Sequence, residues 1–362
     1  PTGPVSVNER NRSKTFISST KLVFLATMSS LSEEKISQFV QNVPFGHWGG
    51  YHEVMPVTDS SKTLSPRDLA VAIGMSESSL KRWVDRGLLE STRTAGGHRR
   101  IRVKEAVRFI RDRQLVVSAP EKLGLSGPVT AAFTERTATP TEDSLYKSFV
   151  DYLEAGEGDR AEALLLHRFL SGESIAELGD LIIRPAMEEL GHGPHGPAEI
   201  VKEHRATQIC LQSIEQMRVM SSFDEPEFRA VGGGSAGNAY LLPTLLAAGV
   251  VEECGGRAIN LGANTPARAL RCEALPTDGR DGNVDFVWLS ISEPINSGEE
   301  RRAIVDLVED CIRGGVHFML GGRSCKTMEL DGLVCEHFTV HPSFQSMHAI
   351  LESAGVQRLR AK

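Results

Sequence analysis

The stretch "SESSLKRWVDRGLLESTRTAGGHRRI", residues 76–101, decides how the first third of the chain folds. Ser76 is a good helix N-cap residue, and the apolar side chains after it recur at three- and four-residue spacing until Gly87. The glycine pair Gly96-Gly97 then predicts a tight turn between two short basic arms. We therefore expect a short helix followed by a β-hairpin that carries guanidinium groups on both arms.

A second helix is predicted immediately before this stretch. Ser65 and Pro66 form a typical helix start, and Gly74 ends the helix. The two helices are expected to share an apolar core made of Leu69, Ile73, Leu80, Trp83 and Val84. The polar residues then fall on the outward face of the second helix, namely Ser78, Ser79, Arg82 and Arg86. Two helices in this relation favour helix-turn-helix geometry, which presents hydrogen-bond donors to base edges or phosphates.

The charge of the chain is unevenly distributed. Residues 81–113 contain 11 Lys and Arg against four Asp and Glu, a local balance of +7, whereas the whole chain carries −7 and the remainder therefore −14. A basic module on an acidic body indicates a polyanion partner for the module, the alternative being a solvated basic face with no ligand. Ser79 and Arg82 are the candidates for base edges. Phosphate and groove contacts are expected from Lys81, Arg93, His98, Arg99 and Arg100.

The segment 61–117 resembles the winged helix-turn-helix of the MerR family and of related excisionase-like proteins, through its "SLKRW" helix and "GGHRRI" hairpin. The resemblance implies binding to double-stranded operator DNA. It also implies a homo-oligomer, a dimer or tetramer, because such families bind repeated or palindromic sites.

The rest of the chain divides by composition and periodicity. Residues 1–60 are predicted to be a flexible N-terminal region, and residues 118–142, rich in Pro, Gly, Ser and Thr, a linker. Residues 143–222 show helical periodicity typical of a bundle of about four helices, and residues 228–358 alternate short apolar strands with helices. The expected fold class is multi-domain: an α+β winged helix-turn-helix, then a four-helix bundle, then an α/β doubly wound five-stranded parallel sheet.

Four short motifs lie in the bundle and the sheet. They are "KEHRAT" (202–207), "LGANTP" (261–266), "SIS" (290–292) and "GVHFMLGG" (315–322). Together with the domain order, they resemble the cobalamin-dependent light-responsive repressors of the CarH kind. The resemblance implies a cobalamin-binding-like sensor domain whose cofactor-binding residues are Glu203, His204, Tyr240, Gly262, Thr265, Ser290, Ser292, Gly321 and Gly322.

Two positions depart from the family pattern. The loop that supplies a cobalt-ligating histidine in the family corresponds to "GNAYLLP" (237–243), with Tyr240 in place of the histidine and Pro243 in place of a glycine. A phenol is a poor cobalt ligand in comparison with a neutral imidazole. The family's bundle tryptophan corresponds to Gly193. The metal ligand is therefore unknown, and the cofactor site is degenerate relative to the family.

Three interpretations of the sensor follow. It binds cobalamin without histidine ligation; it binds haem through Tyr240, His192, His195 or His204; or it binds no tetrapyrrole and serves as a dimerisation or docking body. The bundle-plus-sheet pair also resembles cobalamin-carrying methyltransferase modules, which require the absent histidine. "GGGSAG" (232–237) lacks the spacing of a dinucleotide-binding loop. We therefore expect a regulator and not an enzyme.

Cysteine spacing and hydropathy complete the expectations. The six cysteines form no CxxC pair or zinc spacing, which favours buried reduced thiols. The apolar run "LVFLATM" (22–28) is too short to span a bilayer, and no signal-peptide pattern accompanies it. We expect a cytoplasmic protein with no membrane partner.

Overall fold

The computed structural model describes residues 62–134, 142–192, 196–275 and 284–361, apart from 329, 331, 332 and 334. The predicted flexible region 1–60 lies outside the described residues. All described residues belong to one compact unit, Pro56–Lys362.

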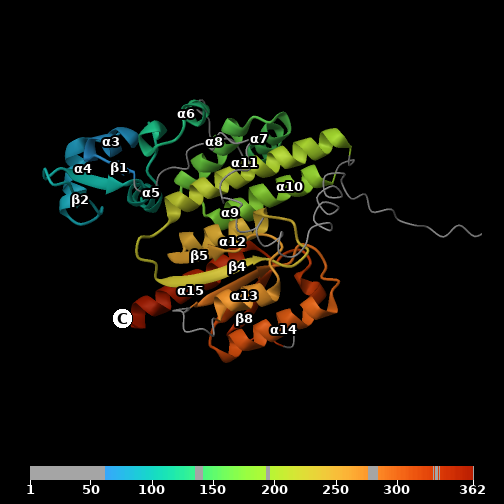
Figure 1. The fold of residues 1–362 in the computed structure, drawn as a ribbon. Helices are drawn as coiled ribbons and strands as arrows, with labels where there is room; N and C mark the ends of the chain where they lie inside the picture. The colour runs from blue at the N-terminus through green and yellow to red at the C-terminus, as the bar shows by residue number, and fades with distance from the viewer. Residues whose placement is uncertain are drawn as a thin grey trace, which may run out of the picture. The chain divides into compact units, whose positions relative to one another are not determined.

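Residues 62–112 form a small module of helices and strands (Figure 1). Its elements are β1 (Thr63–Leu64), α3 (Pro66–Ala72), α4 (Glu77–Asp85), β2 (Thr92–Arg93), β3 (Arg99–Arg102) and α5 (Val103–Asp112). The predicted caps start both leading helices: the Ser65 and Ser76 side chains accept hydrogen bonds from the backbone N–H groups of Asp68 and Ser79. The antiparallel strands have the order β1-β3-β2.

The core of this module is the one that the spacing predicted. Leu69, Ile73 and Leu80 are buried. Trp83 is half-buried and packs at a tilt on Phe109 of α5, with ring centroids 5.1 Å apart. The two leading helices therefore pack on α5 through a continuous apolar layer, which leaves their polar side chains outside.

The segment predicted as a linker, 118–142, is partly helical instead. It contains a 3₁₀ turn η1 (Pro120–Leu123) and the helix α6 (Gly127–Thr134). Val129 and Phe133, four residues apart, are buried, and the Phe133 ring centroid lies 5.0 Å from that of His167. The composition concealed this helix because its start, Ser126-Gly127-Pro128, uses loop-forming residues that are also good helix-start residues.

Residues 142–221 form the helical bundle. Its elements are α7 (Glu142–Ala155), α8 (Gly158–Leu170), α9 (Ile175–Leu178), the π-helical turn η2 (Gly179–Ile183), α10 (Arg184–Gly191) and α11 (Pro197–Ser221). Because α9, η2 and α10 follow each other without a break, the bundle has four helical segments. Fully buried Leu164, Phe169 and Ile214 belong to its apolar core.

Residues 228–361 form a five-stranded parallel sheet with helices on both faces (Figure 1). Its elements are β4 (Phe228–Gly234), α12 (Leu242–Glu253), β5 (Gly256–Asn260), α13 (Ala267–Ala274), β6 (Phe286–Ser290), α14 (Gly298–Arg313), β7 (His317–Gly321), η3 (Cys325–Met328), β8 (Phe338–His341) and α15 (Phe344–Ala361). The strand order β5-β4-β6-β7-β8 confirms the predicted doubly wound sheet. Alternate side chains of the strands join two separate apolar layers, one shared with the bundle, α12 and α15 and the other with α13 and α14.

All six cysteines are free, as expected. Cys210, Cys311 and Cys325 are buried, but Cys272 and Cys335 are exposed, so the expectation of buried thiols is wrong for those two.

Candidate functional site

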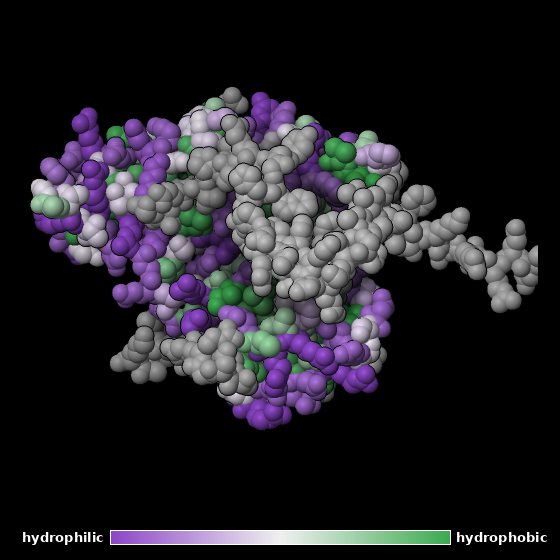
Figure 2. Space-filling model, in the orientation of Figure 1, coloured by the Kyte–Doolittle hydropathy of each residue, from purple (hydrophilic) through white to green (hydrophobic). Residues whose placement is uncertain are grey.

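The outward face of α4 carries the predicted polar side chains. Ser78, Lys81, Arg82 and Arg86 are exposed, and Ser79 is half-buried. Their contacts are local: Arg82 donates to the Ser79 hydroxyl at 3.3 Å, and the Lys81 amine lies 2.8 Å from the Glu77 carboxylate one turn earlier. Hydrophilic residues gather over α3, α4 and β2 in Figure 2. This face is therefore available to an external ligand.

The hairpin between β2 and β3 forms a second basic surface. Gly97 has φ +79°, and Thr94 and His98 close the turn through backbone hydrogen bonds. Arg93 and His98 are exposed, and Arg93 donates to the Gly97 carbonyl at 3.3 Å. The predicted turn is thus observed, with Arg93 and His98 exposed on either side of it.

Arg99 plays a different part from Arg100. It shares a strand face with buried Ile101, and its guanidinium pairs with Asp85 at the end of α4. Arg100 takes the opposite face of β3 and is half-buried. Arg99 therefore fixes the hairpin to α4 rather than pointing away from the protein.

The second candidate site is the carboxyl edge of the parallel sheet between β4 and β6. The connections from these neighbouring strands leave in opposite directions, which makes this the switch point where doubly wound sheets bind ligands. Ser235 and Ser290 end the two strands, and the Ser235 N–H donates to the Ser290 carbonyl at 2.9 Å. Both serines are buried, and neither hydroxyl has a hydrogen-bond partner among the residues that the structure describes. A buried hydroxyl without a partner is costly, so this pair points to a polar ligand group at the edge.

Asn238 organises the loop above this edge. It is fully buried; its side-chain amide donates to the Ser290 carbonyl at 3.2 Å, and its side-chain oxygen accepts from the Tyr240 N–H at 3.0 Å. Its backbone carbonyl accepts from the Asn264 N–H at 2.8 Å. Asn264 has φ +53°, a conformation that asparagine tolerates better than most residues. The loops after β4, β5 and β6 are thereby joined.

The residues predicted to line this edge fall into two groups. Gly262 and Thr265 lie beside β4: the Gly262 carbonyl accepts from the Gly234 N–H, and the Thr265 N–H donates to the Gly234 carbonyl. Ser292 lies on the other side, where its carbonyl accepts from the Arg323 Nε at 2.8 Å.

Gly321 and Gly322 end β7 on the same side as Ser292. A Cβ atom at Gly321 would meet its nearest neighbour, the His341 carbonyl, at an ordinary 3.5 Å. Gly322 has φ +99°, and a Cβ atom there would lie 2.4 Å from the Ile291 carbonyl oxygen. Of these two positions, only 322 therefore requires glycine, because the Ile291 backbone approaches it closely.

Tyr240 is the residue that the sequence places where the resembled family has its ligating histidine. It is 42% exposed, its hydroxyl lies 3.3 Å from the Arg323 guanidinium, and its ring centroid lies 5.2 Å from the guanidinium carbon. Arg323 is itself held by the Ser292 carbonyl and by Glu293. A phenol that contacts a guanidinium cannot take the place of the neutral imidazole that would ligate cobalt. The residues present therefore do not fit a histidine-ligated corrinoid.

The α12 face of the sheet is filled by an indole. Trp288 is 2% exposed, and its N–H donates to the Thr244 hydroxyl of α12 at 3.1 Å. A Cβ atom at Gly232 would lie 2.1 Å from the indole. A bulky ligand group could enter this layer only by displacing Trp288.

The residues proposed for the upper face or for haem are dispersed. Glu203 is half-buried and His204 exposed on α11. His192 ends α10, where its ring nitrogen contacts the Glu188 carbonyl. His195 lies outside the described residues. No group of three or more His, Cys, Asp or Glu side chains within the described ranges could hold a metal ion.

A chain of hydrogen-bonding side chains, of which His341 is buried, connects the neighbouring strands β7 and β8. The Thr339 hydroxyl is 2.8 Å from a ring nitrogen of His317 and 2.8 Å from one of His341, whose other nitrogen is 3.1 Å from the Ser346 hydroxyl. Burial lowers the pKa of His341 to about 4, with a further contribution from the charge of His317. His341 is therefore neutral in the folded chain at neutral pH.

Sequence reasoning missed three residues of the sheet edge: Ser235, Asn238 and Arg323. The available signal was position, since all three follow closely on predicted strand ends. Position alone could not show which loops would contact each other, since the contacting residues lie 52 to 83 positions apart in the chain.

The comparisons with known proteins find a likeness among solved structures alone. No protein-family model matches the chain, and no curated protein matches it. Among solved structures, a monomethylamine corrinoid protein of Methanosarcina barkeri is 14% identical, with a TM-score of 0.43, over 60% of this chain and 99% of that one. A methanol:cobalamin methyltransferase complex of the same organism is 13% identical, with a TM-score of 0.30, over 67% of this chain and 93% of that one.

A cobalamin-binding protein of Desulfitobacterium hafniense is 11% identical, with a TM-score of 0.29, over 59% of this chain and 98% of that one. Identity and TM-score are low in all three cases, and the likeness does not identify a ligand. Separately, none of the described helices is both long and apolar enough to cross a membrane.

Proposed function

We propose that the chain is a DNA-binding transcriptional regulator in which residues 62–117 act as a winged helix-turn-helix and the bundle and sheet act as its sensor body. The observation that carries the proposal is the exposed face of α4, where Lys81, Arg82 and Arg86 project from a short, capped helix above a closed apolar core. A short helix with such a face suits the major groove, where arginine reads guanine edges.

The hairpin supports the same proposal. The Arg99–Asp85 pair joins the hairpin to α4, so that Arg93, His98 and Arg100 extend the surface begun by α4. Guanidinium groups on a hairpin suit phosphate contacts, which supply most of the affinity of DNA-binding proteins. Arg82 is assigned to base edges, and Arg93 and Arg100 to phosphates.

The test is selection of preferred duplexes from a random pool by the full chain, followed by affinity measurements on the selected sequence. Arg82→Ala should lose about 1–3 kcal/mol of discrimination between the selected and a scrambled duplex. Arg268→Ala is the matched control, because Arg268 is an exposed arginine of α13 and its side chain is 74% exposed. Equal discrimination by Arg82→Ala and Arg268→Ala would contradict the assignment.

For the sensor body, we propose a ligand whose polar group binds the unpartnered hydroxyls of Ser235 and Ser290, in a homo-oligomeric regulator. Visible spectra after incubation with adenosylcobalamin, methylcobalamin or haem, followed by gel filtration, distinguish the alternatives. A retained corrin spectrum supports cobalamin bound without histidine ligation, and a Soret band supports haem. A colourless protein of dimeric or tetrameric size supports an oligomerisation body.

Tyr240→His tests how much of a corrinoid site persists. If only the ligating residue differs from the family pattern, the variant gains affinity for cobalamin. Because Arg323 and Trp288 also occupy the edge, we expect no gain from this substitution alone.

A further inference from the structure

The helix α12 joins the sheet edge to the DNA-binding module. Its first residue, Leu242, follows the loop that contains Asn238 and Tyr240, and its last residue is Glu253. Twelve helical residues span about 18 Å, and rigid secondary elements of this kind carry coupling between distant sites. A shift of the loop at one end is therefore carried to the other.

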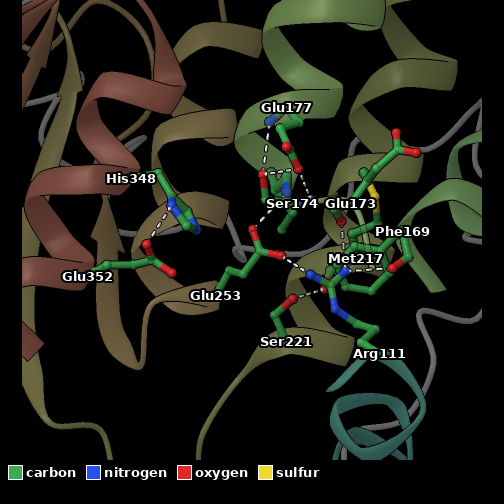
Figure 3. Close-up of polar contacts among 11 residues, drawn as sticks. Arg111, Phe169, Glu173, Ser174, Glu177, Met217, Ser221, Glu253, His348 and Glu352 are labelled. Atoms are coloured by element: carbon green, nitrogen blue, oxygen red, sulfur yellow. Dashed lines mark hydrogen bonds and ion pairs between the residues drawn. The ribbon is translucent and has the colours of Figure 1, made fainter. Parts of the chain in front are cut away.

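Two carboxylates at the far end of α12 hold arginines of other elements. Glu252 accepts from the Nε and a terminal nitrogen of Arg218 on α11, both at 3.0 Å. Glu253 pairs with Arg111 of α5 and accepts from the Ile175 N–H at 2.7 Å (Figure 3). Burial raises the pKa of Glu253 and lowers that of Arg111, while each partner opposes the other's shift. The α5 pairing is thus a buried charge contact between the module and α12.

Arg111 is also fixed to the bundle. It donates to the carbonyls of Phe169 at 2.7 Å and Glu173 at 3.0 Å, and its guanidinium carbon lies 3.8 Å from the centroid of the Phe169 ring (Figure 3). These contacts of the Arg111 side chain all reach outside residues 62–112. Arg111 is therefore a fixed point between the module and the body.

The same face of α5 carries two more basic contacts. Lys104 and Arg108 lie four residues apart, and Arg111 follows three residues later, which places all three on one helix face. Lys104 pairs with Asp224, and Arg108 stacks over Phe223 with its guanidinium carbon 4.0 Å from the ring centroid. Because Arg102 at the start of α5 ends the hairpin strand, a movement of α5 also moves the hairpin.

A cavity of about 670 Å³ lies beside this junction. Arg111 of α5, Glu253 of α12, and His348 and Glu352 of α15 line it, among others. Close-packed interfaces resist displacement, whereas an open one leaves room for a second arrangement of the same side chains. The contact between Arg111 of α5 and Glu253 of α12 lies beside such an open space.

We propose that α12 transmits a change at the sheet edge to the DNA-binding module through the Glu253–Arg111 pair. This inference rests on the proposed function for its biological meaning, but the coupling itself does not require DNA. A change that displaces the Tyr240 loop shifts α12 along its axis, weakens the grip of Glu253 on Arg111, and loosens α5 with the hairpin attached to it.

The experiment is amide hydrogen exchange of the full chain, read on peptides from α5 and from the loop at 235–241. Arg323→Met removes the guanidinium contacts to Tyr240, Glu293 and the Ser292 carbonyl, and Arg323 itself lies outside the core. It should raise exchange in the loop and, about threefold or more, in α5. Glu253→Gln should raise exchange in α5 directly, and Arg323→Met should then add nothing further there.

Glu252→Gln is the matched control, because it removes a carboxylate one residue away that holds α11 instead of α5. It should leave α5 unchanged. The inference is overturned if Arg323→Met loosens the loop but leaves α5 at the wild-type rate, or if its effect on α5 persists in Glu253→Gln.

DNA affinity is measured on the same variants. Absence of DNA binding by the wild type would contradict the proposed function and leave the coupling result standing.

Discussion

Polar residues gather in two regions: on α4 with its hairpin, and at the carboxyl edge of the sheet. The hydrogen-bond and ion-pair partners of these residues differ between the two regions. On α4 the side chains are exposed, and their partners lie within one turn, as for Lys81 with Glu77. At the sheet edge Ser235, Asn238 and Ser290 are buried, and Asn238 bonds to Ser290, 52 positions along the chain. The polar side chains of the first region are therefore accessible to an external ligand, whereas those of the second form hydrogen bonds between loops of the chain.

The largest expected difference between the two regions concerns glycine. Gly322→Ala places a methyl group against the Ile291 backbone at 2.4 Å in a left-handed conformation, and should reduce the free energy of unfolding by about 4 kcal/mol or more. Gly97→Ala, at φ +79° with nothing within 4 Å, should lose only about 1–2 kcal/mol. Urea denaturation of both variants tests this, and equal losses would contradict the contrast.

Histidine gives the next largest difference. Between pH 6.5 and about 4 the unfolded chain binds a proton at His341 that the folded chain does not, because burial lowers the folded pKa to about 4. The stability is complete above pH 6.5 and falls as the pH drops through this window, by about 3 kcal/mol from this group. His341→Asn should flatten the pH profile of unfolding. An unchanged profile in His341→Asn would count against this account of the sheet edge.

The smallest effect belongs to the exposed ion pair on α4. Glu77→Gln should change the free energy of unfolding by at most about 0.5 kcal/mol, because an exposed pair one turn apart contributes little. Thermal unfolding in low salt measures it. A loss above about 1 kcal/mol would show that the Lys81–Glu77 pair stabilises the fold, and would contradict the view that this face is free for a ligand.

This contrast explains how much could be predicted. Ser65, Ser76 and Gly97 act through their own neighbours, so spacing and residue type were enough to predict the caps, the turn and the core beneath them. The strands of the parallel sheet could be predicted equally well, because short apolar runs mark them in the sequence. The roles of Arg99 and Arg111 were not, since the first pairs across 14 residues and the second across 142. The helix α6 was missed because two buried residues carry too weak a periodic signal in a segment that begins with Ser126, Gly127 and Pro128.

The most direct measurement of the central claim is the salt dependence of affinity for a duplex, between about 50 and 200 mM salt. The double variant Arg93→Ala/Arg100→Ala should reduce the slope of log K against log salt by about 0.9 for each lost phosphate contact. Arg268→Ala/Arg313→Ala removes the same charge from exposed arginines of α13 and α14. It should leave the slope of the wild type. The account is contradicted if the two double variants lower the slope equally, or if neither changes it.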